Sequence, residues 1–196
     1  MDTFEIFIHK WYEKQNALCT ETEIDEARNN YDLCLRLYHE ITEEPKAIIR
    51  IDSRDFESFF SDSNVVNAYE CSIDGRDTQR MVKLVNTIKE KIGYSQCPCK
   101  LLLYLFAPDK NDLLMSEMEA VNDWLNESFN NKEIRFGLGI NESSNKMRLV
   151  VMIQYNSRWQ RRLNGKQKYG QRKLMKAIPM LIMVTCGVLT KDLPTL

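Results

Sequence analysis

The stretch KLLLYLFA, residues 100–107, decides the fold. After Lys100 it is a continuous apolar run, and it is short enough to be a single strand. A run of this length is typical of a central strand that is buried on both faces of a sheet. Pro108 and Asp109 follow at once and predict a turn. The sequence therefore predicts a sheet with residues 100–107 inside it.

The flanking residues predict a helix on each side of this strand along the chain. Before it, residues 66–73 alternate in the manner of a strand with mixed burial, which Asp74 and Gly75 close. Asp77 or Thr78 is then expected to begin a helix. Apolar positions at helical spacing mark both predicted helices: Met81, Val85, Ile88 and Ile92 in the first, and Leu114, Met118, Val121 and Leu125 in the second.

Two further strands complete the pattern, EIRFGLGI at 133–140 and MRLVVMIQY at 147–155. The loop between them, NESSNK, predicts a hairpin. The order of elements is thus β-α-β-α-β-β. It predicts a small α+β domain with right-handed β-α-β units and with the two helices packed on one face of the sheet.

A long amphipathic helix precedes this domain. Residues 21–44 carry apolar groups in steps of three and four, and Pro45 ends the helix. The next stretch, AIIRIDSRDFESFF at 47–60, begins extended, and Asp52 or Ser53 can cap a short helix through about Phe60. We expect four parts: an N-terminal segment 1–20, the long helix 21–46, the α+β domain 47–155 and a tail 156–196.

Charge is distributed unevenly along the chain. The tail holds nine Lys/Arg and one acid, Asp192, whereas the first 155 residues hold eighteen Lys/Arg and twenty-seven Asp/Glu. We expect this basic tail to contact an acidic surface. Its partner could be the acidic body of the chain, another protein, nucleic acid or an anionic surface. The apolar run 178–189 is too short to span a membrane, and both a strand and a docking segment stay open for it.

The sequence predicts no cofactor and no metal site. Its seven glycines form no cluster that could bring consecutive backbone N–H groups to a phosphate. Cys97 and Cys99 could give two thiolates to zinc, but a structural site needs about four ligands. The acidic body disfavours nucleic-acid binding by the basic run 158–176. With no 18-residue apolar run and no basic n-region at the N-terminus, we expect a cytoplasmic protein without a membrane span.

In its order of elements the sequence resembles the C-terminal half of FtsZ, the bacterial relative of tubulin. DLCLRLYHEITEEPKAIIRIDSRDFESFF is similar to the end of the family's central helix and its synergy loop. NAYECSIDGRDTQRMVKLVNTI resembles the strand, glycine turn and helix that follow. KLLLYLFAPDKNDLLMSEMEAVNDWL, with Leu114 and Glu117, and NKEIRFGLGINESSNKMRLVVMI, with Ile134, Phe136 and Gly137, are similar to the remaining elements. The resemblance covers about residues 30–155.

The resemblance implies a site in the synergy loop. That loop follows an Asn-x-Asp-x-x-Asp pattern, and the matching positions here are Arg50, Asp52 and Asp55. In FtsZ-type filaments the loop enters the nucleotide pocket of the neighbouring subunit, where its carboxylates help to polarise the attacking water. Arg50 replaces the family's Asn, and with Arg54 it could bind anions or pair with the two aspartates and blunt them.

The resemblance also implies what this chain lacks. No counterpart of the family's Gly-rich GTPase half precedes residue 20. We therefore expect no catalytic residue that acts alone and no enzyme activity in this chain by itself. The terminal DLPTL resembles the short acidic-proline peptide with which FtsZ docks onto partners, so Asp192, Leu193 and Pro194 join the predicted interaction residues.

Three hypotheses follow from the resemblance. The leading one is a non-enzymatic protein–protein interaction module in a filament system of the FtsZ/tubulin type, in bacterial cell division or the cytoskeleton. Its partner would be an FtsZ-type protein or another copy of itself. The second is an activator that supplies Asp52 and Asp55 in trans to a partner GTPase. The third is a fold repurposed for unrelated binding.

Overall fold

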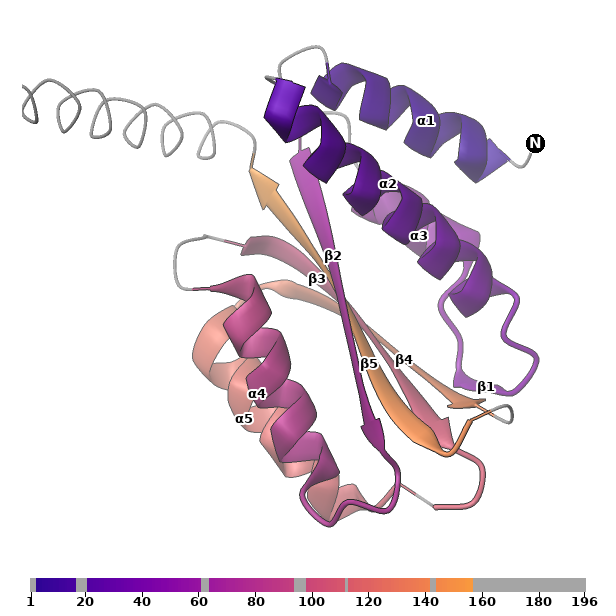
Figure 1. The fold of residues 1–196 in the computed structure, drawn as a ribbon, viewed down its shortest axis with the longest axis vertical. Helices are drawn as coiled ribbons and strands as arrows, with labels where there is room; N and C mark the ends of the chain where they lie inside the picture. Colours follow the sequence, from indigo (N-terminus) through magenta and orange to yellow (C-terminus); the bar gives the residue numbers. More distant parts are fainter. Residues whose placement is uncertain are drawn as a thin grey trace, which may run out of the picture. The chain divides into compact units, whose positions relative to one another are not determined.

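The computed structural model describes residues 3–16, 21–60, 64–93, 98–111, 113–141 and 144–156. They form a five-stranded mixed sheet with helices on both faces (Figure 1). The strands are β1 (Ala47–Ile49), β2 (Asn64–Asp74), β3 (Pro98–Pro108), β4 (Glu133–Asn141) and β5 (Lys146–Asn156). The helices are α1 (Thr3–Asn16), α2 (Glu21–Thr42), α3 (Ser53–Phe59), α4 (Arg80–Ile92), the 3-10 turn η1 (Met115–Glu117) and α5 (Met118–Phe129). The predicted α+β class is confirmed, and so is the order β-α-β-α-β-β for residues 64–156. Before them, residues 47–49, predicted only as an extended segment, form the additional sheet strand β1.

Strand β3 lies at the centre of the sheet, as its apolar run predicts. The strand order is β1-β4-β3-β5-β2, and β3 pairs in parallel with β4 and antiparallel with β5. All residues from Leu101 to Ala107 are buried. Because a strand with two strand neighbours and helices over both faces meets no water, it carries apolar side chains at consecutive positions.

The two helices between the strands cover one face of the sheet. Buried side chains of α4 and α5, such as Leu84 and Trp124, pack with Leu101, Leu103 and Leu105 of β3. This arrangement confirms that the predicted crossover helices share a face. The alternate β3 residues Leu102, Tyr104 and Phe106 point to the other face, as the period of two in a strand requires.

Helices α1, α2 and α3 cover that second face. No helix was predicted within the N-terminal segment 1–20, so α1 is an additional element. Phe4, Ile8 and Trp11 of α1 are buried, and the Phe4 ring stacks on Tyr38 of α2 with 3.9 Å between centroids. A helix of this length is marginal alone, and this packing stabilises it.

The predicted hairpin between the last two strands is wrong. Strand β4 pairs with β3 and β1, whereas β5 lies between β3 and β2, so the last two strands are not neighbours. The reason lies in burial. The residues of β5 from Leu149 to Tyr155 are all buried and need a position with strands on both sides. The first part of β4 carries the exposed Glu133 and Arg135, and it suits a place near the edge because the short strand β1 pairs with β4 only at Leu138 and Gly139.

Two predicted helix starts also shift. Helix α4 begins at Arg80 and not at Asp77 or Thr78, because Asp77 belongs to the preceding turn. Its Oδ1 accepts from the Gln79 amide at 2.9 Å, and its carbonyl accepts from the Arg80 amide at 3.2 Å. Leu114, expected on the buried stripe of the next helix, is 58% exposed because the turn η1 precedes α5.

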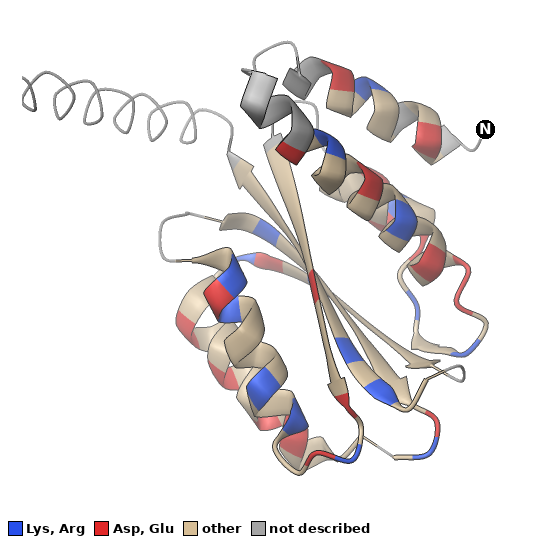
Figure 2. Ribbon diagram, in the orientation of Figure 1, with Lys and Arg blue, Asp and Glu red and all other residues tan. Residues whose placement is uncertain are grey.

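Charged side chains join α2 to the sheet. Figure 2 shows acidic and basic residues interspersed along the visible face of α2. Arg36 pairs with Glu70 of β2 at 2.5 Å, and Arg148 of β5 pairs with Glu40 of α2. The Arg148 guanidinium also lies 4.2 Å from the centroid of the Phe106 ring. These contacts fix the side chains that cross between the helix and the sheet.

Two side chains cover the outer edge of β2, which has β5 as its only strand neighbour among the described residues. Asn30 of α2 donates to the Val66 carbonyl at 2.7 Å and accepts from the Ala68 amide at 2.9 Å. Lys91 of α4 donates to the Glu70 carbonyl at 2.7 Å. An exposed strand edge invites pairing with another chain, and these bonds occupy that edge.

Candidate functional site

One buried side chain anchors the β1–α3 loop, residues 50–52. Ile51 is 4% exposed and lies against Gly137 of β4, where a Cβ atom would stand 2.9 Å from Ile51 Cδ1. The neighbours Arg50 and Asp52 are exposed on either side of it. The loop therefore directs its charged residues to the surface from an anchored backbone.

Asp52 and Asp55 cap the short helix α3. Asp52 Oδ1 accepts from the Asp55 amide at 3.0 Å, and Asp55 Oδ2 accepts from the Asp52 amide at 3.2 Å. This reciprocal capping box satisfies two N–H groups that would otherwise be free at the start of the helix. The prediction that Asp52 begins a short helix is confirmed. The same bonds set the orientation of both carboxylates.

Arg135 of β4 is the cation that faces Asp55. Its Nη1 lies 3.4 Å from Asp55 Oδ1, and its Nη2 lies 3.2 Å from Glu133 Oε1. Both oxygens of Asp55 are therefore engaged, one by a backbone amide and one by a guanidinium. Arg135 was not predicted as a site residue, because it stands about 80 residues away in the sequence and only the sheet brings it beside the loop.

Arg50 and Arg54 are both exposed, and neither forms an ion pair with another described residue. The sequence left open that they pair with Asp52 and Asp55. In the described part of the chain Arg135 takes that place at Asp55. The two arginines therefore keep their charge available to a ligand or partner.

Two apolar side chains extend this surface. Ile48 of β1 is 61% exposed and Ile49 is 42% exposed, although both belong to a strand. A strand of three residues at a sheet edge offers little room to bury them. We call the exposed set Ile48, Ile49, Arg50, Asp52 and Arg54 the loop surface. The apolar entry was visible in the sequence, but its exposure follows from the short pairing of β1 with β4.

The remaining predicted interaction residues, Asp192, Leu193 and Pro194, lie outside the described residues, as does the apolar run 178–189. The loop surface is therefore the predicted site whose geometry can be described. All its charged groups face outward.

A second charged centre joins the starts of the two crossover helices. Arg80 is 5% exposed, and its Nε and Nη2 donate to the two carboxylate oxygens of Glu117 at 2.6 and 2.7 Å. Its Nη1 donates to the carbonyls of Gly75 at 2.5 Å and Asn111 at 3.2 Å. The hydrogen bond from Arg80 lowers the pKa of Glu117, while burial acts in the opposite direction. Glu117 was noted in the sequence, and its buried partner was not.

Other chemistries find little support in the described ranges. No group of three or more His, Cys, Asp or Glu side chains there could hold a metal ion. Burial raises the pKa of the Cys34 thiol, and it raises that of Cys71 to about 11, so neither is an activated nucleophile. Within the same ranges, no helix has the length and apolar character needed to cross a membrane.

The sequence matches no protein-family model and no curated protein. Its fold does match solved structures. A helical model of a two-stranded TubZ-Bt filament aligns with a TM-score of 0.58 and 11% identity over 95% of this chain and 47% of that one. FtsZ from M. jannaschii, as its W319Y mutant, aligns with a TM-score of 0.50 and 14% identity over 70% of this chain and 42% of that one.

A third match is TubZ from Bacillus thuringiensis serovar israelensis in a GTPγS-form protofilament. It gives a TM-score of 0.50 and 12% identity over 87% of this chain and 46% of that one. At such identities the likeness concerns the fold alone. The protein has an FtsZ/tubulin-like fold, and it spans less than half the length of each of these relatives.

Proposed function

We propose that this chain is a non-enzymatic protein–protein interaction module that acts on or within a filament of the FtsZ/tubulin type. The fold likeness supports the class, since the TubZ matches are filament structures. We propose further that the chain corresponds to the C-terminal domain of FtsZ, with the β1–α3 loop in the place of the synergy loop. The partner is then an FtsZ-type protein or a second copy of this chain.

One observation carries the proposal. The β1–α3 loop exposes Arg50, Asp52 and Arg54 beside the apolar Ile48 and Ile49, on a backbone fixed by Ile51 and the capping box. A rigid surface that combines apolar area with arginine suits a protein interface, because the buried core of an interface is apolar and arginine is enriched there. The exposed arginines add a preference for an acidic or otherwise anionic partner surface.

The same geometry supports a role without catalysis. Both oxygens of Asp55 are engaged, and Arg50 stands where the resemblance expects an amide side chain. Together with the lack of a Gly-rich phosphate loop in the sequence, this favours binding over GTP hydrolysis.

The test mixes the full chain with an FtsZ and follows filament length by electron microscopy and GTP turnover. Binding at the loop surface as a cap predicts shorter filaments and lower turnover. Replacing Arg50 and Arg54 by Ala should abolish both effects. The matched control replaces Arg28 and Arg76, which are equally exposed but lie elsewhere, and should leave both effects intact.

Activation in trans is the second candidate, because the capping box holds both carboxylates in a set orientation. It predicts higher GTP turnover on mixing. Asp52→Asn and Asp55→Asn should remove that rise, since Asn preserves the cap but carries no charge. Unchanged filaments and unchanged turnover would contradict both candidates and point to a repurposed fold.

A further inference from the structure

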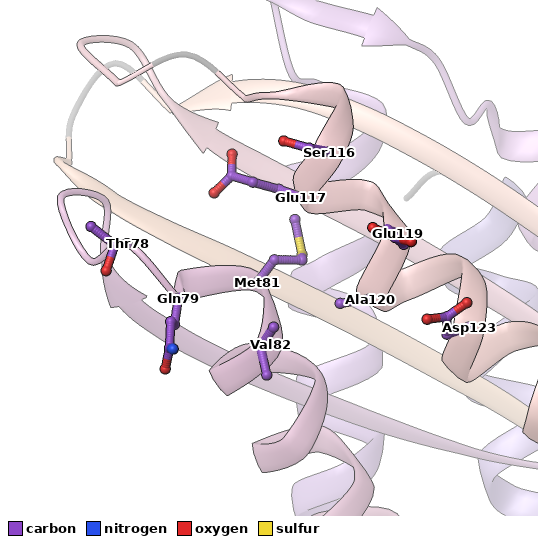
Figure 3. A pocket seen from close by; sticks show the side chains of 9 residues that line it. All are labelled: Thr78, Gln79, Met81, Val82, Ser116, Glu117, Glu119, Ala120 and Asp123. Carbon is purple, nitrogen blue, oxygen red and sulfur yellow. The ribbon is translucent and has the colours of Figure 1, made fainter.

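A groove lies between the first turns of α4 and α5, away from the loop surface. It has a volume of about 380 Å³, and its lining comes from both helices and the turns before them (Figure 3). Met81 and Ala120 are among the apolar residues that line it, together with Val82. Glu117, Glu119 and Asp123 are its three carboxylates, and no Lys or Arg lines it.

Hydrogen bonds within the protein hold part of the groove lining in place before any ligand binds. Arg80 bonds Glu117 on one wall and the carbonyls of Gly75 and Asn111 beneath the two helix starts. Arg80 and Glu117 are nearly buried, with 6% and 15% of their side chains exposed. A surface that is already ordered loses little entropy when a partner binds. The groove is thus suited to bind a ligand without rearrangement.

The mouth of the groove exposes apolar area. Val82 of α4, which lines the groove, is 48% exposed. An exposed apolar side chain in a groove offers area that a partner can remove from water, which favours binding.

The charge of the groove selects the partner. Arg80 neutralises Glu117, whereas Glu119 and Asp123 are exposed and form no ion pair with another described residue. The neighbouring cation Lys83 is already paired with Asp77 at 2.5 Å. Two carboxylates that form no ion pair among the described residues therefore line the groove together with the exposed Val82. This combination is complementary to a large apolar side chain flanked by lysine or arginine.

We propose that the α4–α5 groove is a docking site for a basic amphipathic peptide segment of a partner protein. One apolar side chain of that segment would pack between Val82 and Ala120, which both line the groove, and its cations would reach Glu119 and Asp123. The site is separate from the loop surface and does not depend on its proposed role. It gives the molecule a second interaction surface with its own charge preference.

The test titrates the full chain into a fluorescein-labelled nine-residue peptide that has two leucines at its centre and lysine or arginine elsewhere, and follows anisotropy. Two further probes replace the leucines by serine or every cation by glutamate. We expect the first probe to bind and the other two to bind at least about tenfold more weakly, a loss of about 1.4 kcal/mol.

Variants then locate the site. Glu119→Lys with Asp123→Lys, and separately Val82→Ser, should weaken binding of the first probe about tenfold. The matched double variant Glu57→Lys with Glu90→Lys makes the same charge change at exposed acids away from the groove and should not. Equal losses in both double variants, equal affinity for the serine probe, or no binding at millimolar protein would each overturn the proposal. All these positions are exposed, so the variants should stay folded, which circular dichroism checks.

Discussion

The ring of Tyr104 in β3 lies directly against Gly137 in β4. A Cβ atom on Gly137 would stand 2.3 Å from Cδ2 of that ring, and one on Gly139 would stand 2.7 Å from the Tyr104 hydroxyl. Both glycines of the β4 sequence IRFGLGI thus make room for one aromatic side chain. This contact sets how closely α3 and its loop can approach the sheet, because Ile51 lies against the same glycine.

Gly137 lies against the ring of Tyr104 and Gly139 against its hydroxyl, so Tyr104→Phe should restore stability to a Gly139 variant but not to a Gly137 variant. Gly137→Ala and Gly139→Ala should each lower the free energy of unfolding by about 1–3 kcal/mol through overpacking. Adding Tyr104→Phe should relieve Gly139→Ala, since it removes the hydroxyl, but not Gly137→Ala, where the ring itself is in the way. Urea denaturation of the single and double variants measures this difference.

Tyr104→Phe alone serves as the control. The hydroxyl is buried with no hydrogen-bond partner among the described residues, and burial raises its pKa to about 12. Its loss should cost little stability, since no bond is broken. If Tyr104→Phe rescued both glycine variants equally, the ring would not be the obstacle at Gly137.

Removing the cap of α3 should loosen the loop surface. Asp52→Ala should lower the free energy of unfolding by about 1 kcal/mol, the usual value of a lost helix N-cap, whereas Asp52→Asn should be nearly neutral. Amide hydrogen exchange at residues 53–56 should rise in the Ala variant alone. Equal exchange in both variants would show that Arg135 and not the cap holds this turn.

Acid should weaken the ion pair between Arg80 at the start of α4 and Glu117 just before α5. Arg80 lowers the pKa of Glu117 below its ordinary value of 4.5, so the unfolded chain binds the proton more readily than the folded one. The stability from this group is therefore complete above that value and is lost as pH falls through the lowered pKa. Glu117→Gln should lower the free energy of unfolding at pH 7 by about 2 kcal/mol. It should also reduce the further loss of stability as pH falls below 4.5.

The matched variant for this experiment is Glu119→Gln, which changes an exposed acid of the same region that forms no ion pair among the described residues. Glu119→Gln should change neither the free energy of unfolding at pH 7 nor the loss of stability at acid pH. Urea denaturation between pH 2.5 and 7 compares the three proteins. If Glu117→Gln lost stability at acid pH as steeply as the unchanged protein does, other carboxylates would cause that loss.

Opening the edge of β2 should make the protein self-associate. Asn30→Ala removes the two bonds to Val66 and Ala68 and leaves those backbone groups to water or to another strand. We expect a loss of about 1–2 kcal/mol in stability and a concentration-dependent increase in mass by sedimentation. Asn86→Ala, on the exposed face of α4, is the control. A monomeric Asn30→Ala protein would show that α2 shields the edge by itself.

Local sequence patterns predict several elements of this fold. The run from Leu101 to Ala107 predicts the central strand because every position is apolar, and Asp52 predicts the start of α3 because its side chain can reach the free amides. Helix α1 also left a signal, with Phe4, Ile8 and Trp11 in steps of four and three. It was missed because so few apolar residues among many charged ones predict no stable helix alone.

What local sequence does not contain is which strands become neighbours. The NESSNK loop predicts a hairpin, yet the burial of β5 places it on the far side of β3. The same applies to the site. Arg135 reaches Asp55, and Arg80 reaches Glu117, only after the sheet and the helix starts are assembled. Pairing across such separations depends on total burial and not on turn residues.

The place of β5 has a consequence for how the chain folds. Asn64 pairs with Asn156 and Asp74 with Lys146, so β2 finds its strand partner only in the last strand of the described chain. Closing so long a loop is slow, and proteins with distant pairings fold slowly. On the ribosome β2 must wait for more than 70 further residues before it can pair. Asn30 of α2 is made before β2, so the side chain that closes the outer edge of β2 in the folded protein is already synthesised when β2 emerges.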